Sequence, residues 1–175
     1  MKNPLPPRLK VIGVGNEWRG DDAAGLLVAR RLQADPRPQV EIVESRGTVT
    51  AVLEAWKGAA GVIVVDAVVS GGAPGVIYRF DAHGDGMPLE LSRSPSSHGW
   101  GVAEALALGQ VFQELPPRLI IYGIEGKSFG PGQEVSLEVA AAIPEAARRI
   151  EAEIHSWLGG ESLEEHPPQT GEQSL

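Results

Sequence analysis

Short apolar runs rich in β-branched residues recur along the chain and alternate with amphipathic stretches. Runs of this length and composition predict buried strands, at residues 9–14, 40–43, 61–65 and 118–124. The stretches between and after them predict helices, at residues 23–33, 48–56, 98–114 and from 136 onward. Strands that alternate with helices in this way favour a three-layer α/β/α fold with a mainly parallel twisted sheet flanked by helices.

Two further segments complete the predicted fold. Residues 76–80 are bracketed by Gly-Gly and Pro-Gly pairs and are typical of an edge strand, and residues 81–97 read as a long polar loop. Near the end, Ser136 is a suitable helix cap, and Pro144 is expected to start a second helical piece. An apolar stripe at helical spacing follows, made of Ile143, Ala147, Ile150, Ile154 and Trp157.

The length and charge of the chain limit its organisation and its partners. We expect one domain over residues 1–158, and an acidic, disordered tail over residues 159–175, which carries four Glu and neither Lys nor Arg. The formal net charge is −8, which argues against a nucleic-acid or anionic-membrane partner because both select clustered cations. We expect a monomer.

The chain contains no cysteine, which excludes disulfides, thiolate nucleophiles and Cys-ligated metals together. Any catalytic group must therefore be an oxygen or an imidazole. Prolines interrupt the first ten residues, where a signal peptide would need an apolar stretch, and no apolar run reaches the length that a bilayer requires. A cytoplasmic location is the expectation.

The glycine-rich turn after the first strand raises the question of phosphate binding. Trp18 stands where the dinucleotide fingerprint needs its third glycine. Gly15 and Gly20 have the spacing of a P-loop, but Asp21 and Asp22 occupy the positions of its Lys and Ser/Thr. Two carboxylates at that helix start would repel phosphate, so phosphate binding is disfavoured.

Three acidic or imidazole groups follow different apolar runs. Asp22, Asp66 and His98 each lie just past such a run or its loop, so parallel strands would bring them to one edge of the sheet, where ligands bind in open α/β folds. Two carboxylates and an imidazole suit a borderline divalent metal such as Zn²⁺ or Ni²⁺. Taken singly, the three residues also fit a helix cap, an acid capping loop amides and a solvated imidazole.

Other polar residues are weaker candidates. Glu44 ends the second predicted strand at the same edge and is a candidate outer-shell group or general base, whereas Glu17 is more typical of a solvated loop acid. The remaining histidines, at 83, 155 and 166, read as surface residues. Ser96 and Ser97 lack the strand-turn-helix context of an activated serine.

The motifs of the chain resemble those of the [NiFe] hydrogenase maturation endopeptidases. The resemblance rests on VGNEWRGDDAAG, VVDAVVSGGAPG, SSHGWGVAEALAL and YGIEG, in that order and spacing. It extends from about residue 9 to residue 158, and it implies that Asp22, Asp66 and His98 are the metal-contacting and catalytic residues. Two departures are the Ala at position 23, where many relatives have Gly, and the run Glu-Ser-Arg-Gly-Thr at 44–48, where others show an Asp-Gly-Gly-Thr-like run.

This resemblance implies an endopeptidase that removes the C-terminal peptide of a hydrogenase large-subunit precursor after nickel insertion. The nickel would be carried by the precursor and read by the protease, so no tightly bound resident cofactor is expected, although Zn or Cd could occupy the site. Two alternatives remain: a non-proteolytic, metal-sensing chaperone for the same precursor, and a general metallopeptidase that hydrolyses unrelated peptides.

Overall fold

One twisted five-stranded sheet forms the centre of the protein. The computed structural model describes residues 9–84 and 101–159. The strands are β1 (Leu9–Val14), β2 (Val40–Ser45), β3 (Gly61–Val68), β4 (Ile77–Asp81) and β5 (Arg118–Glu125). Their order in the sheet is β2-β1-β3-β5-β4, with every pair parallel except β4 with β5. The predicted mainly parallel sheet and the predicted edge strand are both confirmed.

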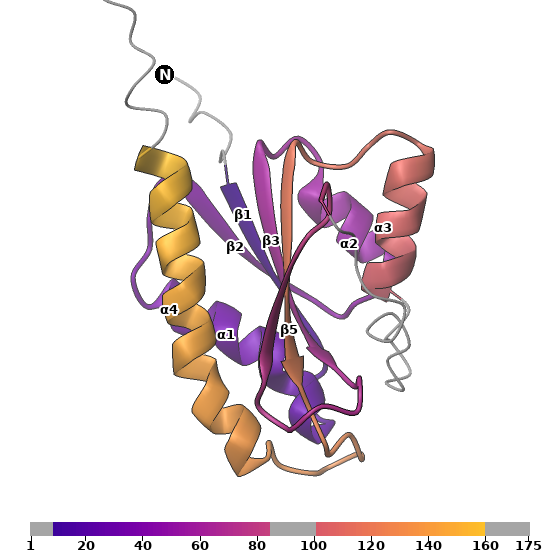
Figure 1. Cartoon of the computed structure of the whole chain (residues 1–175), viewed down its shortest axis with the longest axis vertical. Helices are drawn as coiled ribbons and strands as arrows, with labels where there is room; N and C mark the ends of the chain where they lie inside the picture. Colours follow the sequence, from indigo (N-terminus) through magenta and orange to yellow (C-terminus); the bar gives the residue numbers. More distant parts are fainter. Residues whose placement is uncertain (1–8, 85–100, 160–175) are drawn as a thin grey trace, which may run out of the picture.

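Helices cover both faces of this sheet. The helical elements are the 3₁₀ turn η1 (Gly20–Ala23), α1 (Ala24–Gln33), α2 (Val49–Trp56), α3 (Gly101–Val111) and α4 (Leu137–Gly159). Helices α1 and α4 pack together on one face, and α2 and α3 on the other (Figure 1). The arrangement is the three-layer α/β/α fold expected from the sequence.

The strands divide their side chains between two cores. In β3, Ile63, Val65 and Ala67 join the core under α1 and α4, whereas Val62 and Val64 join the core under α2 and α3. This is the period-two alternation of a strand buried on both faces. Asp66 follows the same alternation, so its side chain projects to the α2 and α3 face of the sheet.

Helix α1 lies unusually close to the sheet. A Cβ atom at Gly25 would overlap the backbone carbonyls of Val14 and Val65, and one at Gly13 would overlap the carbonyl of Gly25. Only hydrogen at these positions allows the helix backbone to approach β1 and β3 directly. The chain entering α1 is thereby held against the carboxyl ends of these two strands.

Two sequence expectations about element boundaries were wrong. Strand β3 continues to Val68, so Asp66 lies inside the strand, opposite Gly123 of β5, rather than past its end. The extension occurs because β5 is equally long and offers backbone partners up to Glu125. Residues 20–23 also form a separate 3₁₀ turn instead of the first turn of α1.

Helix α4 is one continuous helix, and the predicted second piece at Pro144 was wrong. A proline inside a helix removes one hydrogen bond and costs about 3 kcal/mol. The apolar stripe offsets this cost, because Ala147, Ile150 and Ile154 are buried, and Val139 and Ala142 extend the same buried face before the proline. Burial on both sides of Pro144 keeps the helix intact.

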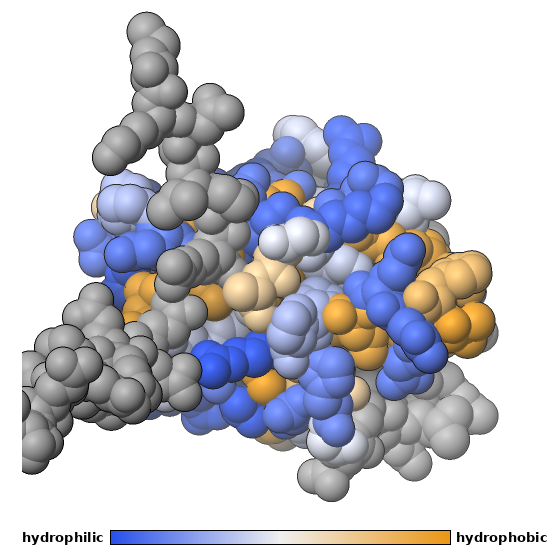
Figure 2. Space-filling model, turned by 90° about the horizontal axis from the view of Figure 1, so that it is seen from above, coloured by the Kyte–Doolittle hydropathy of each residue, from blue (hydrophilic) through white to orange (hydrophobic). Residues whose placement is uncertain are grey.

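The other end of the sheet, at the amino ends of the parallel strands, carries a small apolar area. Figure 2 views the molecule from this end, where an orange area over the end of α3 lies next to blue polar surface. The exposed apolar residues of that helix end are Leu108, Val111 and Phe112. Among the described residues, no helix combines the length and apolar character needed to cross a membrane.

Three predictions fall on residues outside the described ranges. They are the polar loop from residue 85 onward, the start of a helix at His98, and the acidic tail from residue 160. The described part of α3 ends at Val111, a little before the expected end near residue 114, and Gln113 has a positive φ of 58°.

Candidate functional site

The order of the strands places a crevice at the carboxyl ends of β1 and β3. The chain leaves β1 through α1 on one face to reach β2, and returns through α2 on the other face to reach β3. Connections that diverge from neighbouring strands in this way create the position where open α/β sheets bind ligands. Asp22 follows β1 and Asp66 belongs to β3, so the sequence prediction put both acids at this crevice.

The backbone of Asp22 is fixed by the turn that follows β1. The carbonyl of Asp22 accepts a hydrogen bond from the Asn16 N–H (3.2 Å), and the Asp22 N–H donates to the carbonyl of Arg19 (3.2 Å). Gly15 has a φ of 152°, and a Cβ there would overlap the Asp22 carbonyl. Asp22 is 2% exposed. The glycine-rich turn therefore positions a buried carboxylate and does not form a phosphate cradle.

Asp22 and Asp66 influence each other electrostatically. Burial raises the pKa of Asp66 well above its usual value, and the nearby charge of Asp22 raises it further, whereas the hydrogen bond from the Ala67 N–H (2.8 Å) opposes the shift. Two carboxylates that repel each other in this way are stabilised by a shared proton or by a bound cation. The structure thus brings together two of the three predicted site residues.

Asp21, the neighbour of Asp22, has a different environment. Its Oδ2 accepts hydrogen bonds from the N–H groups of Lys127 (2.9 Å) and Ser128 (3.0 Å) and from the Ser136 hydroxyl (3.0 Å). Its Oδ1 accepts from the Ser136 N–H (2.7 Å). Asp21 therefore ties η1 to the loop between β5 and α4, and the hydroxyl of Ser136 serves this contact as a donor.

Another buried carboxylate lies at the end of β5, the strand beside β3. Glu125, at the end of β5, is 1% exposed and accepts from the Ser70 N–H (2.8 Å), the Ser70 hydroxyl (2.7 Å) and the Gly71 N–H (3.1 Å). These bonds fix the loop that follows β3. The acid in the YGIEG motif is thus a structural partner of the VVDAVVSGG motif.

The third predicted residue, His98, lies outside the described residues. The described part of α3 begins three positions later, at Gly101. A Cβ at Gly101 would overlap the carbonyl of Gly47, in the loop between β2 and α2. Within residues 9–84 and 101–159, no group of three or more His, Asp or Glu side chains could hold a metal ion, so the three-residue site stays a prediction.

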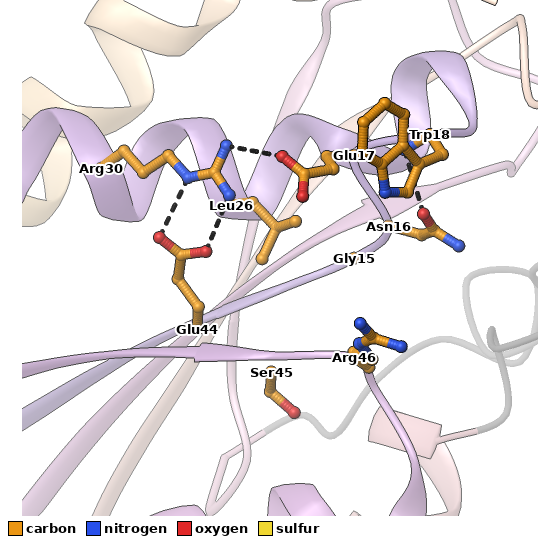
Figure 3. A pocket seen from close by; sticks show the side chains of 9 residues that line it. All are labelled: Gly15, Asn16, Glu17, Trp18, Leu26, Arg30, Glu44, Ser45 and Arg46. Atoms are coloured by element: carbon orange, nitrogen blue, oxygen red, sulfur yellow. Dashed lines mark hydrogen bonds and ion pairs between the residues drawn. The ribbon is translucent and has the colours of Figure 1, made fainter. Parts of the chain in front are cut away.

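Glu17 and Glu44, the secondary candidates, share one arginine. Arg30 of α1 donates to both carboxylate oxygens of Glu44 (3.0 and 2.9 Å) and to Glu17 (3.2 Å), as Figure 3 shows. These bonds, with Glu44 first, raise the pKa of Arg30 above its usual value. Both oxygens of Glu44 are occupied by this bidentate pair, which favours a structural role over that of a general base.

A pocket of about 390 Å³ opens beside this ion-pair cluster. It lies between α1 and the carboxyl ends of β1 and β2 (Figure 3), and it is lined by Gly15, Asn16, Glu17, Trp18, Leu26, Arg30, Glu44, Ser45 and Arg46. Sequence reasoning did not find Arg30 or the structural role of Asp21. In the sequence, Arg30 is only one of several basic residues near predicted helix ends. The Asp-Asp motif does not indicate which of its two acids contacts the loop.

Comparisons with known proteins assign a family to the chain and agree with its fold. The model of the hydrogenase maturation protease family HycI matches residues 26–153. No curated protein gives a significant match. Among solved structures, the chain is similar to the hydrogenase maturating endopeptidase HybD from E. coli, with 25% identity and a TM-score of 0.74 over 85% of this chain and 93% of that one.

Two archaeal structures show the same likeness. The [NiFe] hydrogenase maturation protease HybD from Thermococcus kodakarensis has 26% identity and a TM-score of 0.67, with 83% of this chain and 97% of that one covered. The hydrogenase 2 maturation peptidase from a Thaumarchaeota archaeon has 25% identity and a TM-score of 0.61, with 84% and 97% covered. Because the family model spans well over half of the chain, this protein belongs to the hydrogenase maturation protease family and is an endopeptidase of that class.

Proposed function

We propose that the protein removes the C-terminal peptide of a [NiFe] hydrogenase large-subunit precursor and that it recognises nickel already inserted in that precursor. The observation that carries the proposal is the approach of Asp22 and Asp66, from two different elements, at the crevice between β1 and β3. Two neighbouring carboxylates in a partly buried site are favourable ligands for a divalent cation. The family relationship supports a precursor of this kind as the substrate.

In this proposal nickel belongs to the substrate. Asp22, Asp66 and His98 contact the metal as the precursor docks, and this contact places the scissile bond beside the acid pair. Addition of water across the peptide bond releases a new carboxylate on the large subunit and an amine on the peptide. The metal polarises the carbonyl or the water, and one of the two carboxylates takes up the proton of the attacking water. The protein works as a cytoplasmic monomer.

The test is a processing assay with purified large-subunit precursor, loaded with nickel or free of it, read by mass spectrometry. Wild type is expected to cleave only the loaded form. Asp22→Asn, Asp66→Asn and His98→Ala are expected to lose cleavage, whereas Asp35→Asn, an exposed acid outside the crevice, keeps it. Equal cleavage of nickel-free precursor would contradict nickel recognition, and binding without cleavage by wild type would indicate a chaperone.

A further inference from the structure

The pocket beside the Arg30 ion-pair cluster contains charged groups of both signs, which do not all pair with one another. It contains two carboxylates, Glu17 and Glu44, and two guanidinium groups, Arg30 and Arg46. Arg30 engages both carboxylates. Arg46 is exposed and takes part in none of the ion pairs among the described residues. The acids of the pocket are therefore satisfied internally, and the positive charge of Arg46 is left for a ligand.

The other walls of the pocket suit a peptide. Trp18 is 72% exposed although it is a large aromatic residue, and the largely buried Leu26 lines the pocket beside it. In Figure 3 the guanidinium of Arg46 and the ring of Trp18 lie on the same side of the pocket, with Asn16 between them. An arginine beside an exposed aromatic ring can hold a carboxylate through paired hydrogen bonds while the ring packs on the neighbouring side chain.

The pocket is also placed at a defined distance from the acid pair. Ser45, next to Arg46, pairs with Val14 of β1. Asp66 is the residue of β3 at the same height in the sheet as Val14, because the preceding residues, Gly13 and Val65, pair with each other. Two strand spacings separate these positions, about 10 Å, which is roughly three residues of extended peptide. Gly15 and Asn16 line the pocket and also hold the backbone of Asp22, so a peptide crossing the end of β1 reaches both sites.

We infer that Arg46 is a specificity-determining residue that binds an acidic side chain of the precursor, within about four residues of the scissile bond, while Trp18 packs against the adjoining residue. This inference rests on the proposed function, because it assigns a second contact to the same substrate. It gives a role to the arginine in the run Glu-Ser-Arg-Gly-Thr at 44–48, which lines the pocket.

The experiment compares wild type with Arg46→Glu and Arg46→Lys on nickel-loaded precursor and measures kcat and KM separately. Arg46→Glu is expected to raise KM about tenfold, which corresponds to ~1.4 kcal/mol, with kcat nearly unchanged. The KM of Arg46→Lys is expected to lie between those of wild type and Arg46→Glu. Arg31→Glu makes the same charge change at an exposed position that does not line the pocket, and it is expected to leave KM unchanged.

Replacing the acids near the scissile bond identifies the partner of Arg46. Precursors in which each Asp or Glu within about four residues of the bond is changed to Lys should be poor substrates for wild type, and one of them should be restored by Arg46→Glu. A KM for Arg46→Glu within twofold of wild type would overturn the inference. An equal response of every Lys precursor to both enzymes would overturn it as well, because the arginine would then have no specific partner.

Failure of the proposed function is distinguishable from failure of this inference. If wild type does not cleave loaded precursor, the proposed proteolysis fails. Calorimetric binding of a synthetic peptide that spans the C-terminal region of the precursor then tests Arg46 by itself. Weaker binding by Arg46→Glu, with Arg31→Glu unchanged, supports the inference, and identical binding by all three proteins overturns it.

Discussion

Two adjacent aspartates on the same 3₁₀ turn have opposite surroundings. Asp21 is fully buried and receives four hydrogen bonds from the loop between β5 and α4. Asp22 is also buried, but its neighbour is another carboxylate, that of Asp66. Hydrogen-bond donors stabilise the charge of Asp21. Asp22, in contrast, makes ionisation of the neighbouring Asp66 less favourable. One residue of the pair supports the fold, and we propose that the other takes part in the reaction.

Two other acids of the described residues, the buried Glu125 and the half-buried Glu153, follow the pattern of Asp21. Glu125 is satisfied by the loop after β3, and Glu153 accepts from Arg79 (2.8 and 2.7 Å) and from the Tyr122 hydroxyl (2.9 Å). Burial, followed by the hydrogen bond to Glu153, raises the pKa of Tyr122 to about 12. The pKa of Asp66 is raised, by burial and then by the charge of a neighbouring acid, whereas hydrogen bonds from Arg79 hold the pKa of Glu153 low although Asp81 lies nearby.

The largest effect is expected when the acid pair is neutralised. Asp22→Asn or Asp66→Asn should lower the processing rate by about 10³-fold, because each removes a group that we propose to contact the metal or the attacking water. The rate is measured by mass spectrometry on nickel-loaded precursor. Circular dichroism checks that both variants are folded, and activity above a tenth of wild type would show that the comparison assigns the roles wrongly.

Removing the charge of Asp21 is expected to act on stability. Asp21→Asn puts an amide group against backbone N–H donors and weakens hydrogen bonds to a charged acceptor, so the free energy of unfolding should fall by about 3 kcal/mol. Urea denaturation measures the change, with the exposed Asp35→Asn as a control that should differ little from wild type. A loss below about 0.5 kcal/mol would mean that the loop is held by other contacts.

Neutralising Asp66 should change stability in the opposite direction. Its pKa is raised in the folded protein, so wild type loses stability as the pH rises above the unfolded value of about 3.9. Asp66→Asn lacks this loss and should be more stable than wild type at pH 7, with the difference vanishing below about pH 4. Urea denaturation at both pH values tests it. Equal stability at pH 7 would show that the acid pair is not strained.

The smallest effect on stability is expected at Glu153, which forms an ion pair with Arg79. The hydrogen bonds from Arg79 and then Tyr122 hold the pKa of Glu153 below its usual value against partial burial. This contribution to stability is present above the unfolded pKa of about 4.3 and is lost as the pH falls through the folded value. Glu153→Gln should cost about 1 kcal/mol at pH 7.

Thermal unfolding across the acid range measures the Glu153 effect. The difference from wild type should shrink steadily below about pH 4. Glu134→Gln, at an exposed position in the loop before α4, is the matched control. A difference that stays constant with pH would assign the loss to packing and not to charge.

Much of the fold was predictable because apolar periodicity reports burial. The alternation of runs and amphipathic stretches, with the Gly and Pro pairs around β4, located every described β-strand and α-helix but not the 3₁₀ turn η1, and the mainly parallel arrangement followed from it. The boundaries of β3 and α4 were not predictable, since they depend on partners far away in the sequence. Asp66 stays within its strand because β5 pairs with it, and α4 passes Pro144 because residues on both sides of the proline are buried.

The site was only partly predictable for a related reason. A carboxylate in a motif does not reveal whether its partner will be an amide, a cation or another acid. Asp21 and Asp22 are identical in sequence terms, and only the position of the loop at 127–136 separates them. The Arg30 cluster depends in the same way on α1 lying over the end of β2.

The hydrogen bonds of Asp21 also have a consequence for the order of folding. They join positions more than 100 residues apart in the chain, and contacts of such long range are slow to form because a large loop must close first. During synthesis, the turn that bears Asp22 cannot be fully anchored until Ser136 has left the ribosome. We expect the proposed proteolytic site to mature late, after most of the sheet has formed.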